Sequence, residues 1–365
     1  MTTHKLKQKG KITRRQALKS GGLLGLGLAT GGVPTLLRAG ANDLTVVAWG
    51  GGTQDVQRET MFTPFAKETG IKVLDTSTPN AAKIKAQVDT GNIEWDVVYT
   101  SLNYFYNLGT DYFEPIDYSH WSQTQIDEFP KESLTEYSVG GTLFSVVNTY
   151  RTDVFPTGQH PKNWTEFFDA GSFPGPRALY ASSDLISHTT EHALQAAGLT
   201  PDEVYPMTAE KVDIAFSELD KIKPHVTNWY SSSASGIQLL ANKEVVMGNF
   251  SNGRGYALAQ SGLPVGIEWQ GGTVNSDCWM IVKGTKNLEG AQRFIQYVST
   301  AEKLAALTSR VPNGPANLGA LALLDKEWAS HLPSSHLDKQ VFLDLKWWSE
   351  HQQEMIQRYL EWVAA

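Results

Sequence analysis

The order of apolar segments in the first hundred residues constrains the fold most strongly. A short apolar run at 44–49 leads into glycines and then into 54–69, where apolar residues recur at roughly helical spacing. Strand-like residues return at 71–74, a second helical segment follows at 81–88, and a third apolar run occupies 95–99. This alternation predicts a parallel sheet with right-handed crossovers, whose carboxyl edge is where α/β proteins place ligands.

The rest of the chain continues the alternation, so the predicted fold class is α/β throughout. The later expected strands are 143–147, 178–180, 244–247 and 278–282, and the later expected helices are 163–168, 185–197, 211–222, 288–298 and 342–363. We find no internal repeat, and no apolar run after residue 41 approaches membrane length.

Residues 1–41 have the composition of an export signal. Arg14 and Arg15 precede a weakly apolar, glycine-rich stretch at 21–29, and a small-x-small pattern ends at Ala41. The apolar stretch is shorter than the ~20 residues that span a bilayer. The pattern therefore predicts a twin-arginine signal peptide, the Tat translocase as a partner during export, and a periplasmic product.

Charge and cysteine content argue against nucleic-acid-binding, lipid-binding and disulfide-stabilised proteins. Eight of the 31 basic residues and none of the 38 acidic residues lie in 1–41, so the remaining chain has a formal charge of −15. Nucleic-acid binding needs a basic surface, and anionic lipid would be repelled as well. Cys278 is the only cysteine, so no intrachain disulfide can form. At 324 residues, the exported chain is expected to form two domains.

Several landmarks resemble those of a known family, in the same order along the chain. They are 48–51, 65–73, 95–98, Asn252-Gly253, Glu268, Asp277, 291–295 and 310–317. The chain is similar to bacterial periplasmic solute-binding proteins of ABC importers, in particular to the spermidine/putrescine-binding family. The segment Phe-x-x-Glu-Thr-Gly-Ile-x-Val within 65–73 is the most specific part of the match.

The resemblance implies a two-lobed periplasmic binding protein fold with a ligand cleft between the lobes and two hinge crossovers. The crossovers would lie near 139–148 and 274–277. The implied domains are lobe one (42–140 plus 277–315), lobe two (148–275) and C-terminal helices (316–365). The implied function is import of a small amine-bearing solute, either a polyamine or an amino-acid-like molecule. Permease subunits in the inner membrane would be the partners; no cofactor, no metal and no catalysis are expected.

Five candidate ligand contacts follow from matched positions. Trp49 would stack on an alkyl amine, and Gly50 with its neighbouring glycines would let the backbone approach a ligand. Asp277 would pair with a ligand amine, because an acid entering an apolar strand needs a partner. Ser101 and Asn103 follow the third strand and could bond a polar head group. The alternatives are a core tryptophan, a hinge or cap role for Asp277, and an N-cap role for Ser101.

Four positions depart from the polyamine-binding pattern. Two acids that clasp the far amine and two cleft aromatics are replaced here by Leu185 and His188, and by Ser251 and Asn275. Arg254 lies beside Ser251 and would repel a dication, whereas arginine suits a carboxylate. We therefore expect a smaller, zwitterionic solute with Asp277 on its amine and Arg254 on its acid group. His188 remains a candidate contact, and the alternative for Arg254 is an ordinary surface arginine.

A rival hypothesis comes from the spacing His188-x-x-Glu191-His192. It matches the inverted zinc-peptidase motif, so a Tat-exported zinc-dependent hydrolase is the alternative function. A third ligand such as Glu203 or Glu210 would be needed. An iron-binding member of the superfamily is also conceivable, but the adjacent tyrosine pair is absent and Trp229-Tyr230 is the nearest equivalent.

Overall fold

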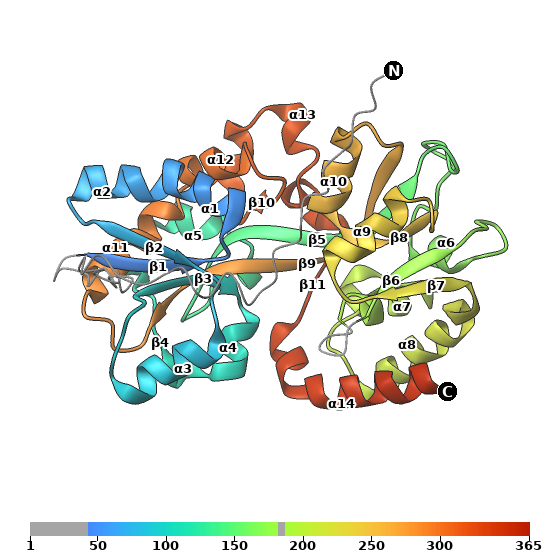
Figure 1. Ribbon diagram of the computed structural model, residues 1–365, viewed down its shortest axis with the longest axis horizontal. Helices are drawn as coiled ribbons and strands as arrows, with labels where there is room; N and C mark the ends of the chain where they lie inside the picture. Colours follow the sequence, from blue (N-terminus) through green and yellow to red (C-terminus); the bar gives the residue numbers. More distant parts are fainter. Residues whose placement is uncertain (1–42, 182–186) are drawn as a thin grey trace, which may run out of the picture. The chain divides into compact units, whose positions relative to one another are not determined.

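A computed structural model describes residues 43–181 and 187–365 (Figure 1). The predicted signal peptide, 1–41, and the aligned position Leu185 lie outside these residues. Among the residues described, no helix is both long and apolar enough to cross a bilayer.

The predicted parallel sheet at the start of the chain is confirmed. Strand β1 (Leu44–Ala48) pairs in parallel with β2 (Val73–Ser77) on one side and with β3 (Val97–Ser101) on the other. Between β1 and β2 the chain is helical from Gly51 to Thr69, where a π-helical turn, Arg58–Phe62, joins α1 (Gly51–Gln57) to α2 (Thr63–Thr69). The carboxyl ends of β1 and β3 therefore lie at the same edge.

Two long strands carry the sheet across the molecule. Within the described residues the strand order is β2-β1-β3-β9-β5-β8-β6-β7. Strand β9 (Val265–Val282) pairs antiparallel with β3 and with β5 (Val139–Arg151), and β5 pairs antiparallel with β8 (Met247–Ser251). These two strands contain both of the segments predicted as crossovers. A short strand, β11 (Val341–Phe342), pairs with β9 at Thr273 and Val274.

The second group of strands is again parallel. β6 (Arg177–Tyr180) pairs with β7 (Val226–Tyr230) and with β8. The strand predicted at 244–247 is displaced, because β8 begins only at Met247. Residues 244–246 form the turn that follows α9 (Ser233–Ala241), with the Val245 amide bonded to the Leu239 carbonyl. Val245 is buried. Its apolar character reflects core packing rather than membership of the strand.

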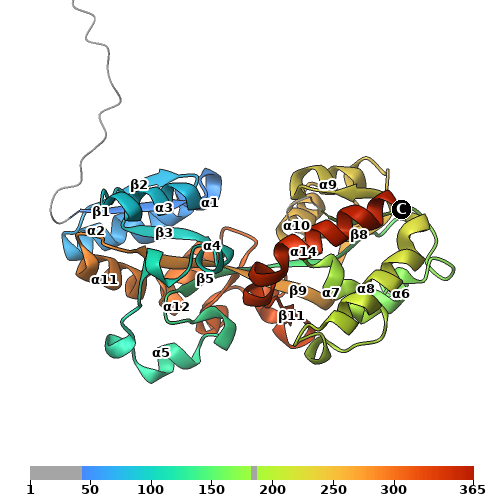
Figure 2. The ribbon, with the colours of Figure 1, turned by 90° about the horizontal axis from the view of Figure 1, so that it is seen from below.

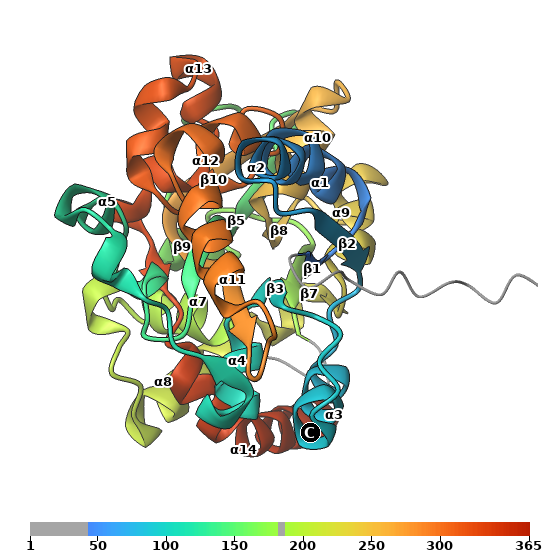
Figure 3. The ribbon, with the colours of Figure 1, turned by 90° about the vertical axis from the view of Figure 1, so that its left-hand side faces the viewer.

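Helices flank these strands (Figures 1 and 3). Besides α1, α2 and α9, the helices within the described residues are α3 (Ala81–Thr90), α4 (Asn103–Leu108), α5 (Gln123–Asp127), α6 (Trp164–Phe168), α7 (Thr189–Ala196), α8 (Ala209–Ile222), α10 (Asn252–Gln260), α11 (Leu288–Val298), α12 (Ala301–Thr308), α13 (Lys326–Ala329) and α14 (Leu345–Ala364). The predicted helix 288–298 coincides with α11. The shorter strand β4 (Phe113–Glu114) pairs with β9, and β10 (Gly314–Pro315) pairs with β5.

The buried hydrophobic side chains fall into separate clusters on the two sides of the crossing strands. One large cluster joins β1, α2, β3 and α11 through Phe62, Phe65, Trp279 and Phe294. Another joins α6, α7, α8 and α14. Figure 2 shows α14 running beside α8, where Arg358 forms an ion pair with Asp213 at 2.7 Å. The core is thus divided, although the predicted domain boundaries themselves remain a prediction.

Candidate ligand-binding site

Trp49 follows the last residue of β1 and is held by a single polar contact. Its Nε1 donates a hydrogen bond of 3.1 Å to Oδ1 of Asp277, and its ring meets Tyr104 edge-on at 6.2 Å. The side chain remains 46% exposed. Every other tryptophan, tyrosine and phenylalanine of the described residues is buried or half-buried, so Trp49 presents an indole face that the fold itself does not cover.

Gly50 continues the chain in a conformation that other residues rarely adopt. Its φ is 87° and its ψ is −171°, and it precedes the first residue of α1. A Cβ placed there would lie 3.1 Å from the Cβ of Ser77. Both backbone conformation and space therefore favour glycine at this turn.

Asp277 is a partly buried carboxylate on β9. Its strand position pairs with Ser101 of β3, which brings it to the carboxyl end of that strand. Burial raises the pKa of the Asp277 carboxyl to about 6, and the hydrogen bond from Trp49 opposes that shift. The carboxylate is ionised at pH 7, and the hydrogen bond from Trp49 offsets only part of the cost of burying its charge. A nearby cation would therefore stabilise it.

Ser101 and Asn103 complete this group at the carboxyl edge. The amide of Asn103 donates to Oγ of Ser101 at 3.4 Å, and Asn103 is the first residue of α4. Oδ1 of Asn103 is buried and accepts no hydrogen bond from another described residue. The structure thus brings Trp49, Gly50, Ser101, Asn103 and Asp277 together. Sequence reasoning missed Tyr104, which contacts the indole; an aromatic residue at the second position of the helix that follows a ligand-edge strand was the available signal.

The remaining predicted residues, His188 and Arg254, lie on elements of the second strand group. His188 immediately precedes α7, has a φ of 69° and is only 4% exposed. Its Nδ1 lies 2.7 Å from Oγ1 of Thr273, and burial lowers the pKa of the imidazole to about 3, so the ring is neutral. Arg254 is exposed on α10 and makes no hydrogen bond or ion pair with another described residue. Among the described residues, no hydrogen bond, ion pair or ring contact joins either residue to the Trp49–Asp277 group.

The zinc-motif residues do not converge on a metal. Oε1 of Glu191 accepts hydrogen bonds from Oη of Tyr205 (2.6 Å) and Nε1 of Trp348 (2.7 Å). His192 instead stacks on Trp164 with ring centroids 3.7 Å apart. In the part of the chain that the structure describes, no three histidine, cysteine or acidic side chains are placed to hold a metal ion. The motif spacing is therefore explained by buried packing.

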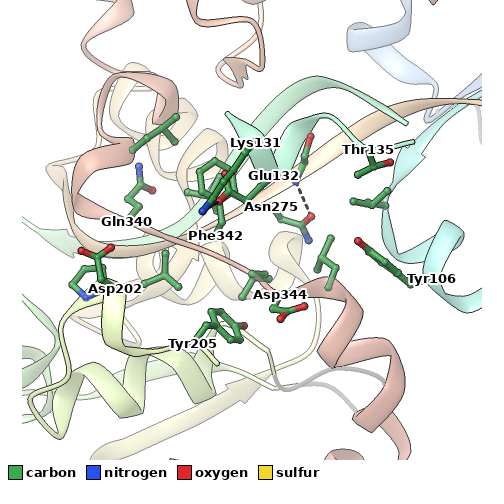
Figure 4. Close-up of a pocket in the computed structure, with 18 residues that line it drawn as sticks. Tyr106, Lys131, Glu132, Thr135, Asp202, Tyr205, Asn275, Gln340, Phe342 and Asp344 are labelled. Atoms are coloured by element: carbon green, nitrogen blue, oxygen red, sulfur yellow. Dashed lines mark hydrogen bonds and ion pairs between the residues drawn. The ribbon is translucent and has the colours of Figure 1, made fainter. Parts of the chain in front are cut away.

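A cavity of ≈ 620 Å³ lies elsewhere, between the loops around Lys131 and Asp202 (Figure 4). Asn275, Tyr205 and Asp344 also line it, whereas none of the seven predicted site residues does. In Figures 2 and 3, α1 and α9 lie on one side of β5 and β9, and α5 and α8 lie on the other. The loops around Lys131 and Asp202 adjoin α5 and α8, and none of the predicted contacts lines the cavity, so its size alone does not make it the ligand site.

Known proteins resemble this chain over most of its length. Residues 60–333 match the family model of bacterial extracellular solute-binding proteins. The gamma-aminobutyric acid-binding protein of Pseudomonas aeruginosa is 32% identical over 90% of this chain and 92% of its own length. The spermidine/putrescine-binding periplasmic protein of Escherichia coli is 26% identical over 73% and 76% of the respective chains.

A solved structure extends the match to three dimensions. An ABC transporter substrate-binding protein from Bradyrhizobium japonicum is 34% identical, superposes with a TM-score of 0.76, and covers 88% of this chain and 98% of its own. The fold is that of periplasmic binding proteins, as the sequence predicted. The chain belongs to the bacterial extracellular solute-binding proteins and is a substrate-binding component of an ABC importer.

Proposed function

We propose that this protein is the periplasmic receptor of an importer for a small zwitterion whose primary amine and carboxylate are separated by a few methylenes. Gamma-aminobutyrate is the representative ligand. The relative with 32% identity is named for binding that compound. The carboxylate of Asp277 is suited to the ammonium end of such a ligand, and the guanidinium of Arg254 is suited to its carboxylate end.

The observation that carries the proposal is the state of Asp277. Trp49 occupies Oδ1, and Oδ2 makes no hydrogen bond to another described residue. A primary ammonium carries three donors. One of them could reach Asp277 and another the unpartnered Oδ1 of Asn103. A charge-assisted pair at a partly buried carboxylate would release the desolvation penalty that raises its pKa.

The positive charge of Arg254 would select the carboxylate end of the ligand. Arg254 is an exposed guanidinium without a partner among the described residues, on the helix that directly follows β8. A guanidinium binds a carboxylate through two parallel hydrogen bonds and repels a second ammonium. A diamine would find one acid and one cation here, whereas an amino acid would find a complement for each group.

The mechanism proposed is closure of two lobes on the ligand. The lobes have the boundaries stated above, and β5 and β9 act as the hinge. The closed form would then dock on the permease pair in the inner membrane. The leader 1–41 would direct Tat export, and the protein would catalyse no reaction. The arrangement of Glu191 and its two neighbouring histidines supports a binding protein over the zinc-hydrolase alternative.

Isothermal titration of the chain from residue 42 onward tests this proposal. Gamma-aminobutyrate should bind, while butylamine and butyrate, which each keep one end, should bind at least tenfold more weakly. Arg254→Ala should weaken gamma-aminobutyrate binding but leave butylamine unchanged. Arg293→Ala is the matched control, since Arg293 is also exposed and unpaired among the described residues, on α11. Tighter binding of putrescine than of gamma-aminobutyrate would refute the proposal.

A further inference from the structure

A chain of buried hydrogen bonds beneath α7 determines which nitrogen of His192 carries a proton. Oδ1 of Asn249 accepts from the Tyr180 amide at 2.6 Å, so the other amide atom of Asn249 is the NH₂ group. That group lies 2.9 Å from Oγ1 of Thr189 and 3.2 Å from Nδ1 of His192. Nδ1 of His192 is therefore an acceptor, and its proton is on Nε2.

The same reasoning passes through Thr273 to His188. Nε2–H of His192 faces Oγ1 of Thr273 at 3.3 Å. The hydroxyl of Thr273 has one proton and can accept two hydrogen bonds. If Nδ1 of His188 carried a proton, the hydroxyl would accept from both imidazoles and could donate only to the Val146 carbonyl, 3.5 Å away and at the limit of a hydrogen bond. We therefore assign the hydroxyl proton to the 2.7 Å contact with Nδ1 of His188. Burial lowers the pKa of both imidazoles, so both rings are neutral. His188 therefore accepts at Nδ1 and is a donor at Nε2.

Nε2 of His188 and the hydroxyl of the preceding residue both lack a hydrogen-bond partner among the described residues. Nε2 makes no hydrogen bond to another residue that the structure describes. Oγ of Ser187 is buried and has no hydrogen-bond partner within 43–181 and 187–365. Both residues immediately precede α7, whose first amides carry a partial positive charge. The ring of His188 lies edge-on to Tyr180, the last residue of β6, at 6.1 Å. The two donors therefore lie at the carboxyl edge of the second strand group.

We infer that the N-terminus of α7, with Nε2–H of His188 and Oγ–H of Ser187, receives the carboxylate of the ligand and selects amino acids over diamines. This inference rests on the proposed function and adds a recognition element to Arg254. A neutral imidazole whose Nδ1 is occupied can only donate from its other edge, so it suits an anion and leaves an ammonium unsatisfied. An acidic side chain at this position would instead attract an ammonium and repel a carboxylate. Selectivity for amino acids thus comes from rejection of the second ammonium of a diamine as well as from attraction of a carboxylate.

Two substitutions separate the donor at Nε2 from the contact at Nδ1. The amide of His188→Asn occupies the place of Nδ1 and keeps a bond to Thr273, but has nothing at the place of Nε2. The longer amide of His188→Gln places an NH₂ group where Nε2–H was. By titration calorimetry, His188→Asn should weaken gamma-aminobutyrate at least about tenfold, the loss expected for a hydrogen bond to a charged group. His188→Gln should lose only a few-fold. Binding of butylamine should be the same in both variants.

Three results would overturn the inference. The first is equal loss of gamma-aminobutyrate and butylamine binding in both variants, which would show that His188 only supports the fold. The second is a ¹H–¹⁵N histidine spectrum of the ligand-free protein in which His188 is protonated at Nδ1. The third is an unshifted His188 Nε2–H resonance with butyrate at high concentration. The last two tests need no gamma-aminobutyrate binding, so they decide the inference even where the proposed function fails.

Discussion

Replacing Asp277 with asparagine should make the ligand-free protein more stable while destroying amine binding. The folded-state pKa of this carboxyl is raised from 3.8 to about 6. At 1.36 kcal/mol per unit, the ionised group lowers the free energy of unfolding by about 3 kcal/mol at pH 7. Asparagine carries no charge and still offers an oxygen to Nε1 of Trp49. The variant should therefore recover most of that free energy.

The pH dependence gives this prediction a definite sign. Because the folded-state pKa is raised, the penalty is complete above pH 6, shrinks as the pH falls through that value, and vanishes below 3.8. Urea unfolding at pH 7.5 should show Asp277→Asn as more stable than the parent, by about 3 kcal/mol or somewhat less. The difference should decrease at pH 5. An equally stable or less stable variant at pH 7.5, or a difference that grows on acidification, would refute the reasoning.

The ligand should reverse the order of stability. Removing one partner of a desolvated, hydrogen-bonded charge pair costs about 2–5 kcal/mol of binding free energy. At saturating gamma-aminobutyrate the parent should be stabilised, by about 2.7 kcal/mol at 100 times the dissociation constant. Asp277→Asn should gain almost nothing from the ligand. Affinity of the parent should itself fall as the pH drops below about 6, where Asp277 takes up a proton.

Three further perturbations test other parts of the structure. Trp49→Phe removes the hydrogen bond to Asp277, so the midpoint of the pH-dependent affinity should move above the parent's; an unmoved midpoint in calorimetry would contradict the contact. Gly50→Ala forces a side chain into a glycine-only conformation and toward Ser77, and urea unfolding should show a loss of about 1–3 kcal/mol. Glu191→Gln removes a buried ionisable group that burial makes harder to charge; it should leave gamma-aminobutyrate affinity unchanged in calorimetry, whereas hydrolytic activity that depends on Glu191 would revive the zinc alternative.

Local patterns were sufficient for most of the fold. The strand–helix alternation of 44–99 is realised as β1, β2 and β3 in parallel, and the amphipathic pattern of 288–298 is realised as α11. Such patterns depend on periodicity within a single element, so they can be seen without tertiary contacts. The displaced strand at 244–247 shows the limit. Val245 and Val246 have the composition of a strand but precede β8: Val245 is a buried residue bonded to the end of α9, and Val246 is half-buried.

The sequence by itself determined the class of fold, the family resemblance and the identity of the candidate residues, because composition and order along the chain carry that information. Only the tertiary structure decided which of them meet. Trp49 and Asp277 are 228 positions apart, and the register of β3 against β9 places them in hydrogen-bond contact. The same holds for the spacing of His188, Glu191 and His192. In the sequence alone, this spacing fits either a metal-binding motif or a buried hydrogen-bond network. Its partners Thr273 and Asn249 come from other strands, and a hydrogen bond between distant residues depends on packing that no local pattern encodes.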